Sequence, residues 1–212
     1  MVDLRFQSPC SIQLAGVPNS GKTFLTAQII ENRDRLFTQT FDKIVFLYRE
    51  WQPLYDKLEK EEGVLFTSSL DEVEEHSRSP EPVLIILDDV VMDLISNSKE
   101  ILPYFLSRSH HGNNTVMILT QAIFLPNARL MQINCQYLIL FKLARDSSSV
   151  LRLGCQIHPL SPRFLYNVYL DVVEKKPFAH LVIDSTSTQS PLARFRSSVF
   201  YWEPDFLLYS PK

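Results

Sequence analysis

Glycine and cysteine are scarce in this chain, which has five glycines and three cysteines among its 212 residues. Cys10, Cys135 and Cys155 are odd in number and lack the C-x-x-C spacing of metal and redox sites. This usage is typical of reduced thiols that fill the core, and it favours a reducing compartment. Because glycine is so rare here, two glycines at the required places of a motif rarely arise by chance.

Long apolar runs and an excess of positive charge are also missing. No run approaches the roughly 18 residues of a membrane helix, and no basic and apolar leader begins the chain. We therefore expect a soluble intracellular protein. The formal net charge of −3 argues against a stand-alone nucleic-acid-binding protein, which normally carries a clear basic excess. Any contact with nucleic acid must then be local.

Two of the five glycines belong to the sequence GVPNSGKT at residues 16–23, which has the form G-x-x-x-x-G-K-[ST]. An apolar run at residues 12–15 precedes it and is the expected strand. Backbone N–H groups of such a loop wrap a β-phosphate, Lys22 reaches the β and γ oxygens, and the Thr23 hydroxyl binds Mg²⁺. The sequence thus predicts a site for ATP and Mg²⁺. The residues expected to line it are Gly16, Pro18, Asn19, Ser20, Gly21, Lys22 and Thr23.

A second motif is acidic: Asp88 and Asp89 directly follow the apolar run at residues 83–87. Five apolar residues ending in carboxylates fit a central parallel strand whose carboxyl end meets the ligand. We expect Asp88 to hold Mg²⁺, directly or through water, and Asp89 to orient or deprotonate the attacking water. The alternative is a strand that ends in solvated acids.

The order of apolar runs and helical patterns predicts a single α/β domain over residues 1–212, with a mostly parallel sheet covered on both faces. Strands are expected at residues 12–15, 44–48, 64–67, 83–87, 116–120 and 137–143, and two more, 179–184 and 197–202, are expected to extend the sheet, with an antiparallel direction left open. Helices are expected at residues 22–36, 51–61, 92–107, 125–133 and 162–174. Residues 71–82 and 184–191 are expected to be surface connections.

Two strands separate the phosphate loop from the Asp88 strand along the chain, which is typical of recombinase-like and additional-strand ATPases. The strand at residues 116–120 ends beside Gln121, whose amide can donate to a γ-phosphate and accept from water. Gln121 is therefore a candidate sensor of hydrolysis, or else only caps its strand. Arg108 precedes this strand, at the opposite edge from its own nucleotide. It is either a surface arginine or a finger that reaches a neighbour's γ-phosphate in a ring.

Taken together, several blocks resemble the viral DNA-packaging ATPases of the FtsK-HerA superfamily, in the branch of poxviruses, other large DNA viruses, virophages and Polinton or adintovirus elements. The blocks are the phosphate loop, Leu87-Asp88-Asp89, residues 110–115 leading into Leu119-Thr120-Gln121, residues 137–142 followed by Arg145-Asp146, and residues 176–184. The resemblance covers roughly residues 8–200. Many members of the wider superfamily end the metal strand in Asp-Glu, where this chain has Asp88-Asp89.

The resemblance implies a RecA/FtsK-like P-loop fold and a homo-oligomeric ring that hydrolyses ATP to push double-stranded DNA into a preformed capsid. It makes Arg108 the preferred trans-acting finger and Gln121 the sensor. With Asp89, which the acidic motif itself points to, these are the predicted catalytic residues, and Arg145 is the next candidate for the finger. The implied partner is a capsid or portal protein, and no binding to a membrane is expected. The implied location is the nucleus or cytoplasm of a host cell and transiently the capsid vertex.

Other interpretations remain. A small viral ring helicase has a similar phosphate loop, but a shorter interval to the metal strand and an Asn sensor. A nucleoside monophosphate kinase fits the length, yet it needs several arginines and a mobile lid. A nucleotide-dependent scaffold is the non-enzymatic alternative. No Asn-Lys-x-Asp motif for guanine occurs, which disfavours a GTPase. Residues 145–149 can also simply begin a helix, with Asp146 or one of the serines as its cap.

Overall fold

The computed structural model describes residues 2–88, 113–126, 128–186 and 190–211, and within them one nine-stranded sheet forms the frame. The strand order is β3-β2-β4-β5-β1-β6-β7-β8-β9. The strands are β1 (Ser11–Ala15), β2 (Lys43–Leu47), β3 (Leu65–Thr67), β4 (Val83–Leu87), β5 (Asn114–Thr120), β6 (Tyr137–Leu140), β7 (Leu181–Asp184), β8 (Phe195–Arg196) and β9 (Leu208–Tyr209). Strands β3 to β6 in this order run parallel, and β7, β8 and β9 continue the sheet antiparallel. The predicted fold class is confirmed.

Strand β5 lies between β1 and β4, so the strand before the phosphate loop and the strand before Asp88 are not neighbours. In the register, Ala15 of β1 pairs with Thr120 of β5, and Leu87 of β4 pairs with Ile118. The carboxyl ends of these three parallel strands therefore meet at one edge of the sheet. This is the additional-strand arrangement that the sequence predicts.

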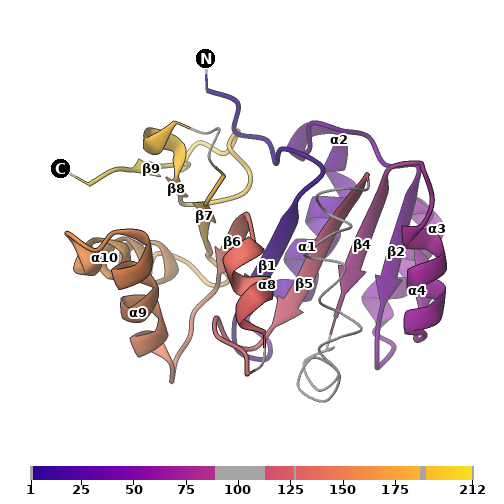
Figure 1. The fold of residues 1–212 in the computed structure, drawn as a ribbon, viewed down its shortest axis with the longest axis horizontal. Coiled ribbons are helices and arrows are strands. Elements are labelled where there is room, and N and C mark those ends of the chain that lie inside the picture. The colour runs from indigo at the N-terminus through magenta and orange to yellow at the C-terminus, as the bar shows by residue number, and fades with distance from the viewer. Residues whose placement is uncertain (1, 89–112, 127, 187–189, 212) are drawn as a thin grey trace.

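Helices cover both faces of the sheet. The helices of the described residues are α1 (Lys22–Glu31), α2 (Arg33–Leu36), α3 (Pro53–Glu62), α4 (Leu70–Ser77), α8 (Arg129–Asn134), α9 (Ser147–Ile157), α10 (Pro162–Val173) and the 3₁₀ turn η2 (Pro191–Ala193). Phe46 of β2 packs in one cluster with Leu25 of α1, whereas its neighbour Val45 packs in another with Val73 of α4. Figure 1 shows α3 and α4 beside β2, and α9 and α10 at the other end of the sheet. Among the residues that the structure describes, every helix is too short or too polar to cross a bilayer.

Several predicted elements differ from the structure. Residues 71–82 are not only a connection, because α4 forms there with Val73 buried beneath an acidic outer face. The helix predicted at residues 22–36 is interrupted at Asn32, and the helix predicted at residues 125–133 shortens to α8. The helix predicted at residues 92–107 lies outside the described residues.

The strand predicted at residues 197–202 does not form. The short β8 ends at Arg196, and the chain then continues in bends and turns. Ser198, Val199 and Phe200 are buried in succession, without the alternation of a half-covered strand. Val199 and Phe200 thus fill the core without joining the sheet.

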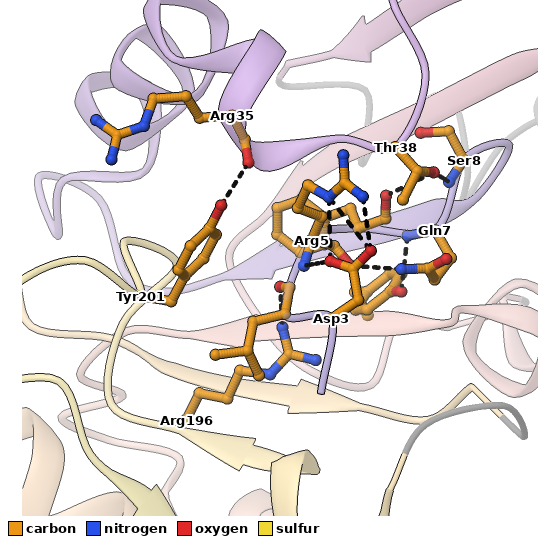
Figure 2. A network of polar contacts seen from close by, with 11 residues as sticks. Asp3, Arg5, Gln7, Ser8, Arg35, Thr38, Arg196 and Tyr201 are labelled. Atoms are coloured by element: carbon orange, nitrogen blue, oxygen red, sulfur yellow. Dashed lines mark hydrogen bonds and ion pairs between the residues drawn. The ribbon is translucent and has the colours of Figure 1, made fainter. Parts of the chain in front are cut away.

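Polar contacts fasten the last part of the chain to the first. Arg196 and Asp184 form an ion pair whose side chains are 2% and 0% exposed. The Arg196 guanidinium also donates to the Leu4 carbonyl oxygen at 2.6 Å, and the Tyr201 hydroxyl donates to the Arg35 carbonyl oxygen at 2.9 Å (Figure 2). These contacts lie at the edge opposite the carboxyl ends of β1, β4 and β5, because Asp184 pairs with Tyr137 at the start of β6.

Candidate active site

The loop at residues 16–23 connects β1 to α1 and depends on both of its glycines. Gly21 is the N-cap residue of α1 and has φ of 100°, a left-handed conformation that side chains disfavour. A Cβ atom on Gly16 would lie 2.5 Å from Ser20 Oγ and 2.7 Å from Phe141 Cβ. Asn19 also has a positive φ, 59°, which asparagine tolerates better than most residues. Close packing therefore explains the glycine at position 16, and positive φ angles explain the residues at positions 19 and 21.

Lys22 begins α1, and its ammonium group lies against the loop. Its Nζ donates to the carbonyl oxygens of Gly16 at 2.7 Å and Val17 at 3.0 Å. The first turn of α1 contains no acidic residue, so its dipole adds to the positive potential of Lys22. Both features favour an anion at the start of α1.

Asp88 follows β4 and lies next to the first turn of α1. The Thr23 hydroxyl donates to Asp88 Oδ2 at 3.3 Å, and the Tyr55 hydroxyl donates to the same oxygen at 3.1 Å. Octahedral Mg²⁺ holds its ligands at about 2.1 Å, which puts adjacent ligand oxygens about 3 Å apart. The Thr23 and Asp88 oxygens have the chemistry and spacing of such a pair, so these residues fit the predicted Mg²⁺ site.

Gln121 lies at the end of β5, at the same edge as Asp88. A buried glutamine in β1 holds the turn that follows: Gln13 Nε2 donates to Thr120 Oγ1 at 3.0 Å and to the carbonyl oxygens of Ala122 at 3.2 Å and Ile123 at 3.1 Å. The Gln121 side chain is exposed at this turn. Gln13 was not predicted as a site residue, although a polar residue inside a buried strand is a signal that could have found it.

A cavity of about 430 Å³ brings most predicted residues together. Its lining is Pro18, Asn19, Gly21, Lys22, Thr23, Phe24, Arg49, Glu50, Gln52, Tyr55, Asp88, Leu119, Thr120, Gln121 and Phe178. Gly16 and Ser20 lie within the loop but do not line this cavity. Asp89 and Arg108 lie outside the described residues, so their predicted roles stay predictions.

Sequence reasoning missed several contributors to this cavity, among them Arg49, Tyr55 and Phe178. Arg49 comes two residues after β2, whose carboxyl end shares the edge of β4, so the parallel-sheet rule could have found it. Tyr55 on α3 and Phe178 before β7 lie at the site through long-range packing, for which the sequence carries no local signal.

Arg145 is exposed after β6, and α9 begins at Ser147 with Asp146 as its N-cap residue. The helix-start interpretation of this segment is confirmed.

Neither a protein-family model nor a curated protein sequence matches the chain. Solved structures match in fold. The chain is similar to B204, the DNA-packaging ATPase from Sulfolobus turreted icosahedral virus, with a TM-score of 0.59 and 10% identity over 96% of this chain and 98% of that one. It is also similar to the genome-packaging NTPase B204 from Sulfolobus turreted icosahedral virus 2 in complex with ATP-gammaS, with a TM-score of 0.54 and 12% identity over 96% and 98% of the two chains.

A third similar structure is the cytoplasmic domain of the type VII secretion ATPase EccC from Thermomonospora curvata. Its TM-score is 0.50 at 13% identity, over 89% of this chain and 25% of that one. The chain therefore has a P-loop NTPase fold. More narrowly, this is the fold of genome-packaging NTPases over nearly the whole length of both chains, so the resemblance seen in the sequence is confirmed at the level of the fold.

Proposed function

We propose that the chain is an ATP-hydrolysing motor that moves double-stranded viral or virus-like DNA into a preformed capsid. The observation that carries the proposal is the cavity where Lys22, Thr23, Asp88 and Gln121 meet at the carboxyl edge of an additional-strand sheet. The fold shared with packaging NTPases supports the biological setting by analogy.

The phosphates of ATP bind to the loop at residues 16–23 and to Lys22. Mg²⁺ held by Thr23 and Asp88 would neutralise phosphate charge when bound. Asp89 takes a proton from the attacking water while the water oxygen bonds to the γ-phosphorus. The bond between that phosphorus and the β–γ bridging oxygen breaks, and ADP leaves. Gln121 contacts the γ-phosphate. When hydrolysis removes this contact, the turn after β5, which Gln13 supports, changes its conformation.

The motor works as a homo-oligomeric ring, and Arg108 of one subunit reaches the nucleotide of the next. Such a finger is typically worth about 10³ to 10⁵ in rate. Contact with DNA is local, since the net charge is −3. A capsid or portal protein receives the DNA, inside the host cell at the capsid vertex.

The test is ATP turnover of the purified protein with and without double-stranded DNA, compared with Lys22→Ala. The proposal expects turnover that DNA stimulates several-fold and that Lys22→Ala removes. Turnover indifferent to DNA would leave an ATPase but contradict the motor, and phosphate transfer to a nucleoside monophosphate would favour the kinase. Binding of ATP without any turnover would favour the nucleotide-dependent scaffold.

A further inference from the structure

Phe178 has an unusual backbone for an aromatic residue. Its φ is 62°, in the left-handed region that bulky side chains rarely adopt, and it lies in the loop between α10 and β7. Its side chain is nevertheless 63% exposed. Strain of this kind persists where the surrounding structure holds it, and it concentrates at functional sites.

The Phe178 ring rests on the phosphate loop. A Cβ atom on Gly21 would lie 2.9 Å from Phe178 Cδ1 and 3.2 Å from its Cβ, so the ring covers the N-cap residue of α1. Phe178 lines the 430 Å³ cavity that contains Lys22 and also a second cavity of about 600 Å³. The ring therefore borders both the phosphate site and this second cavity.

Contacts inside the fold hold the Phe178 backbone. Burial lowers the pKa of His180 to about 4, so its ring is neutral at neutral pH. Its Nε2 accepts the Val199 N–H at 3.3 Å, which leaves Nδ1 as the N–H that faces the Phe178 carbonyl oxygen at 3.4 Å. The Ala179 N–H donates to the Lys176 carbonyl oxygen at 3.2 Å, which closes the turn. The ring is thus presented by a fixed loop.

The second cavity has the size of a nucleoside site. It lies between residues 17–20 of the phosphate loop and residues 173–179, with Lys142 and Ala144 beyond the end of β6. Its volume of about 600 Å³ is within the usual range for small-molecule sites. An exposed aromatic ring at the boundary of a phosphate site provides a flat surface on which a base can stack.

We propose that Phe178 is the stacking surface for the base of the bound nucleoside triphosphate, and that the second cavity holds the nucleoside. This inference rests on the proposed binding of ATP at Lys22. Every base has a π face, so stacking on Phe178 strengthens binding without selecting strongly among bases. Phe178 is a positioning residue and takes no part in bond breaking.

The test compares Phe178→Leu with the wild type for three probes: MgATP, MgGTP and inorganic tripolyphosphate. Leucine keeps an apolar side chain over Gly21 but removes the π face. The dissociation constants of MgATP and MgGTP should both rise about tenfold, and that of tripolyphosphate should change less than about twofold. Phe206→Leu is the matched control, because Phe206 is a partly exposed aromatic residue that lines neither cavity. It should change none of the three.

Equal weakening of all three probes by Phe178→Leu would overturn the proposal, because the ring would then act only on the shape of the phosphate loop. Unchanged MgATP binding would overturn it too. Phe178→Trp gives a second readout that does not need the leucine variant to fold. Its fluorescence should be quenched by MgATP beyond the wild-type change and not by tripolyphosphate, and the reverse contradicts stacking. Absence of nucleotide binding in the wild type would instead remove the proposed function itself.

Discussion

Two aspartates of this chain share one local pattern and have different surroundings. Asp88 follows the buried strand β4, and Asp184 ends the buried strand β7. Strand β4 runs parallel to β1, so Asp88 lies at the edge where the phosphate loop begins. Strand β7 runs antiparallel to β6, so Asp184 lies at the opposite edge, beside Tyr137. An apolar run ending in aspartate therefore predicts a strand, while the direction of that strand decides what the carboxylate does.

The partners of the two carboxylates differ accordingly. Asp184 is buried with Arg196, and Thr186 contributes a backbone N–H at 3.0 Å and a hydroxyl at 2.6 Å to its Oδ1. Asp88 lines a cavity and accepts from the hydroxyls of Thr23 and Tyr55. A buried charge pair needs both members, since removal of one leaves the other uncompensated. A carboxylate that faces a cavity can instead bind an ion from solution. We therefore expect substitutions at the Asp88 edge to change ATP turnover and substitutions at the Asp184 edge to change the free energy of unfolding.

The largest expected effect is that of Lys22→Ala. It removes a fixed positive charge from the start of α1, and we expect nucleotide affinity to fall about 100-fold or more, because hydrogen bonds to charged groups are the strong ones. Fluorescence titration with ATP measures the loss. Lys57→Ala is the control, since Lys57 pairs with Glu31 on the outside of α3. Affinity within about twofold of wild type in Lys22→Ala would mean that phosphates bind elsewhere.

The next effect is that of Asp88→Asn. We expect turnover to fall about 100-fold, because a neutral amide binds Mg²⁺ poorly and loss of metal charge stabilisation costs several kcal/mol. The thermal midpoint should change little, as the side chain faces a cavity. Turnover at rising Mg²⁺ concentration and a thermal melt measure the two quantities. A large fall in the melting temperature would show that Asp88, like Asp184, stabilises the fold.

Asp89→Asn provides the matched comparison for Asp88. It should keep MgATP binding and lose turnover, because it retains the shape of the side chain and removes the base. Loss of MgATP binding as well would place Asp89 in the metal shell.

Much of this edge of the molecule could be predicted from sequence, because its signals are local. The phosphate loop is a contiguous motif, and the strand before Asp88 is an uninterrupted apolar run, so the roles of Lys22 and Asp88 follow from spacing and from the rule for parallel sheets. Tyr55 and Phe178 could not be found in this way. Each lies at the site because a distant segment packs there, and their own neighbours in sequence carry no pattern that reports it.

The Asp184 edge was harder to predict for the same reason. The pairing of Asp184 with Arg196 depends on the β7–β8 pairing and on the short length of β8, which the sequence predicted as a longer strand further along the chain. Helix α4 was missed because one strongly buried residue, Val73, stands among polar ones. Only the tertiary environment shows that this face is covered.

Arg196→Met tests the Asp184 edge. We expect the free energy of unfolding to fall by about 3–5 kcal/mol, since the Asp184 carboxylate stays buried without its partner. Adding Asp184→Asn should restore part of the lost free energy of unfolding. ATP turnover per folded molecule should be unchanged. Chemical denaturation measures the difference. Arg5→Met is the control, because the Arg5–Asp3 pair near the N-terminus (Figure 2) has exposed side chains, and exposed pairs contribute little to stability.

The smallest expected effects come from removing one hydroxyl at each carboxylate. Tyr55→Phe keeps the buried ring and its stacking on Phe66 at 4.8 Å but removes the donor to Asp88. We expect turnover to fall about three- to tenfold with little change in melting temperature, because the carboxylate loses a contact that orients it toward Thr23. Thr186→Val removes the donor to Asp184 and keeps the backbone N–H contact. It should cost about 1 kcal/mol of stability and leave turnover unchanged. If Tyr55→Phe lowered stability and spared turnover, the two carboxylates would both be structural, and the assignment of Asp88 to the active site would be wrong.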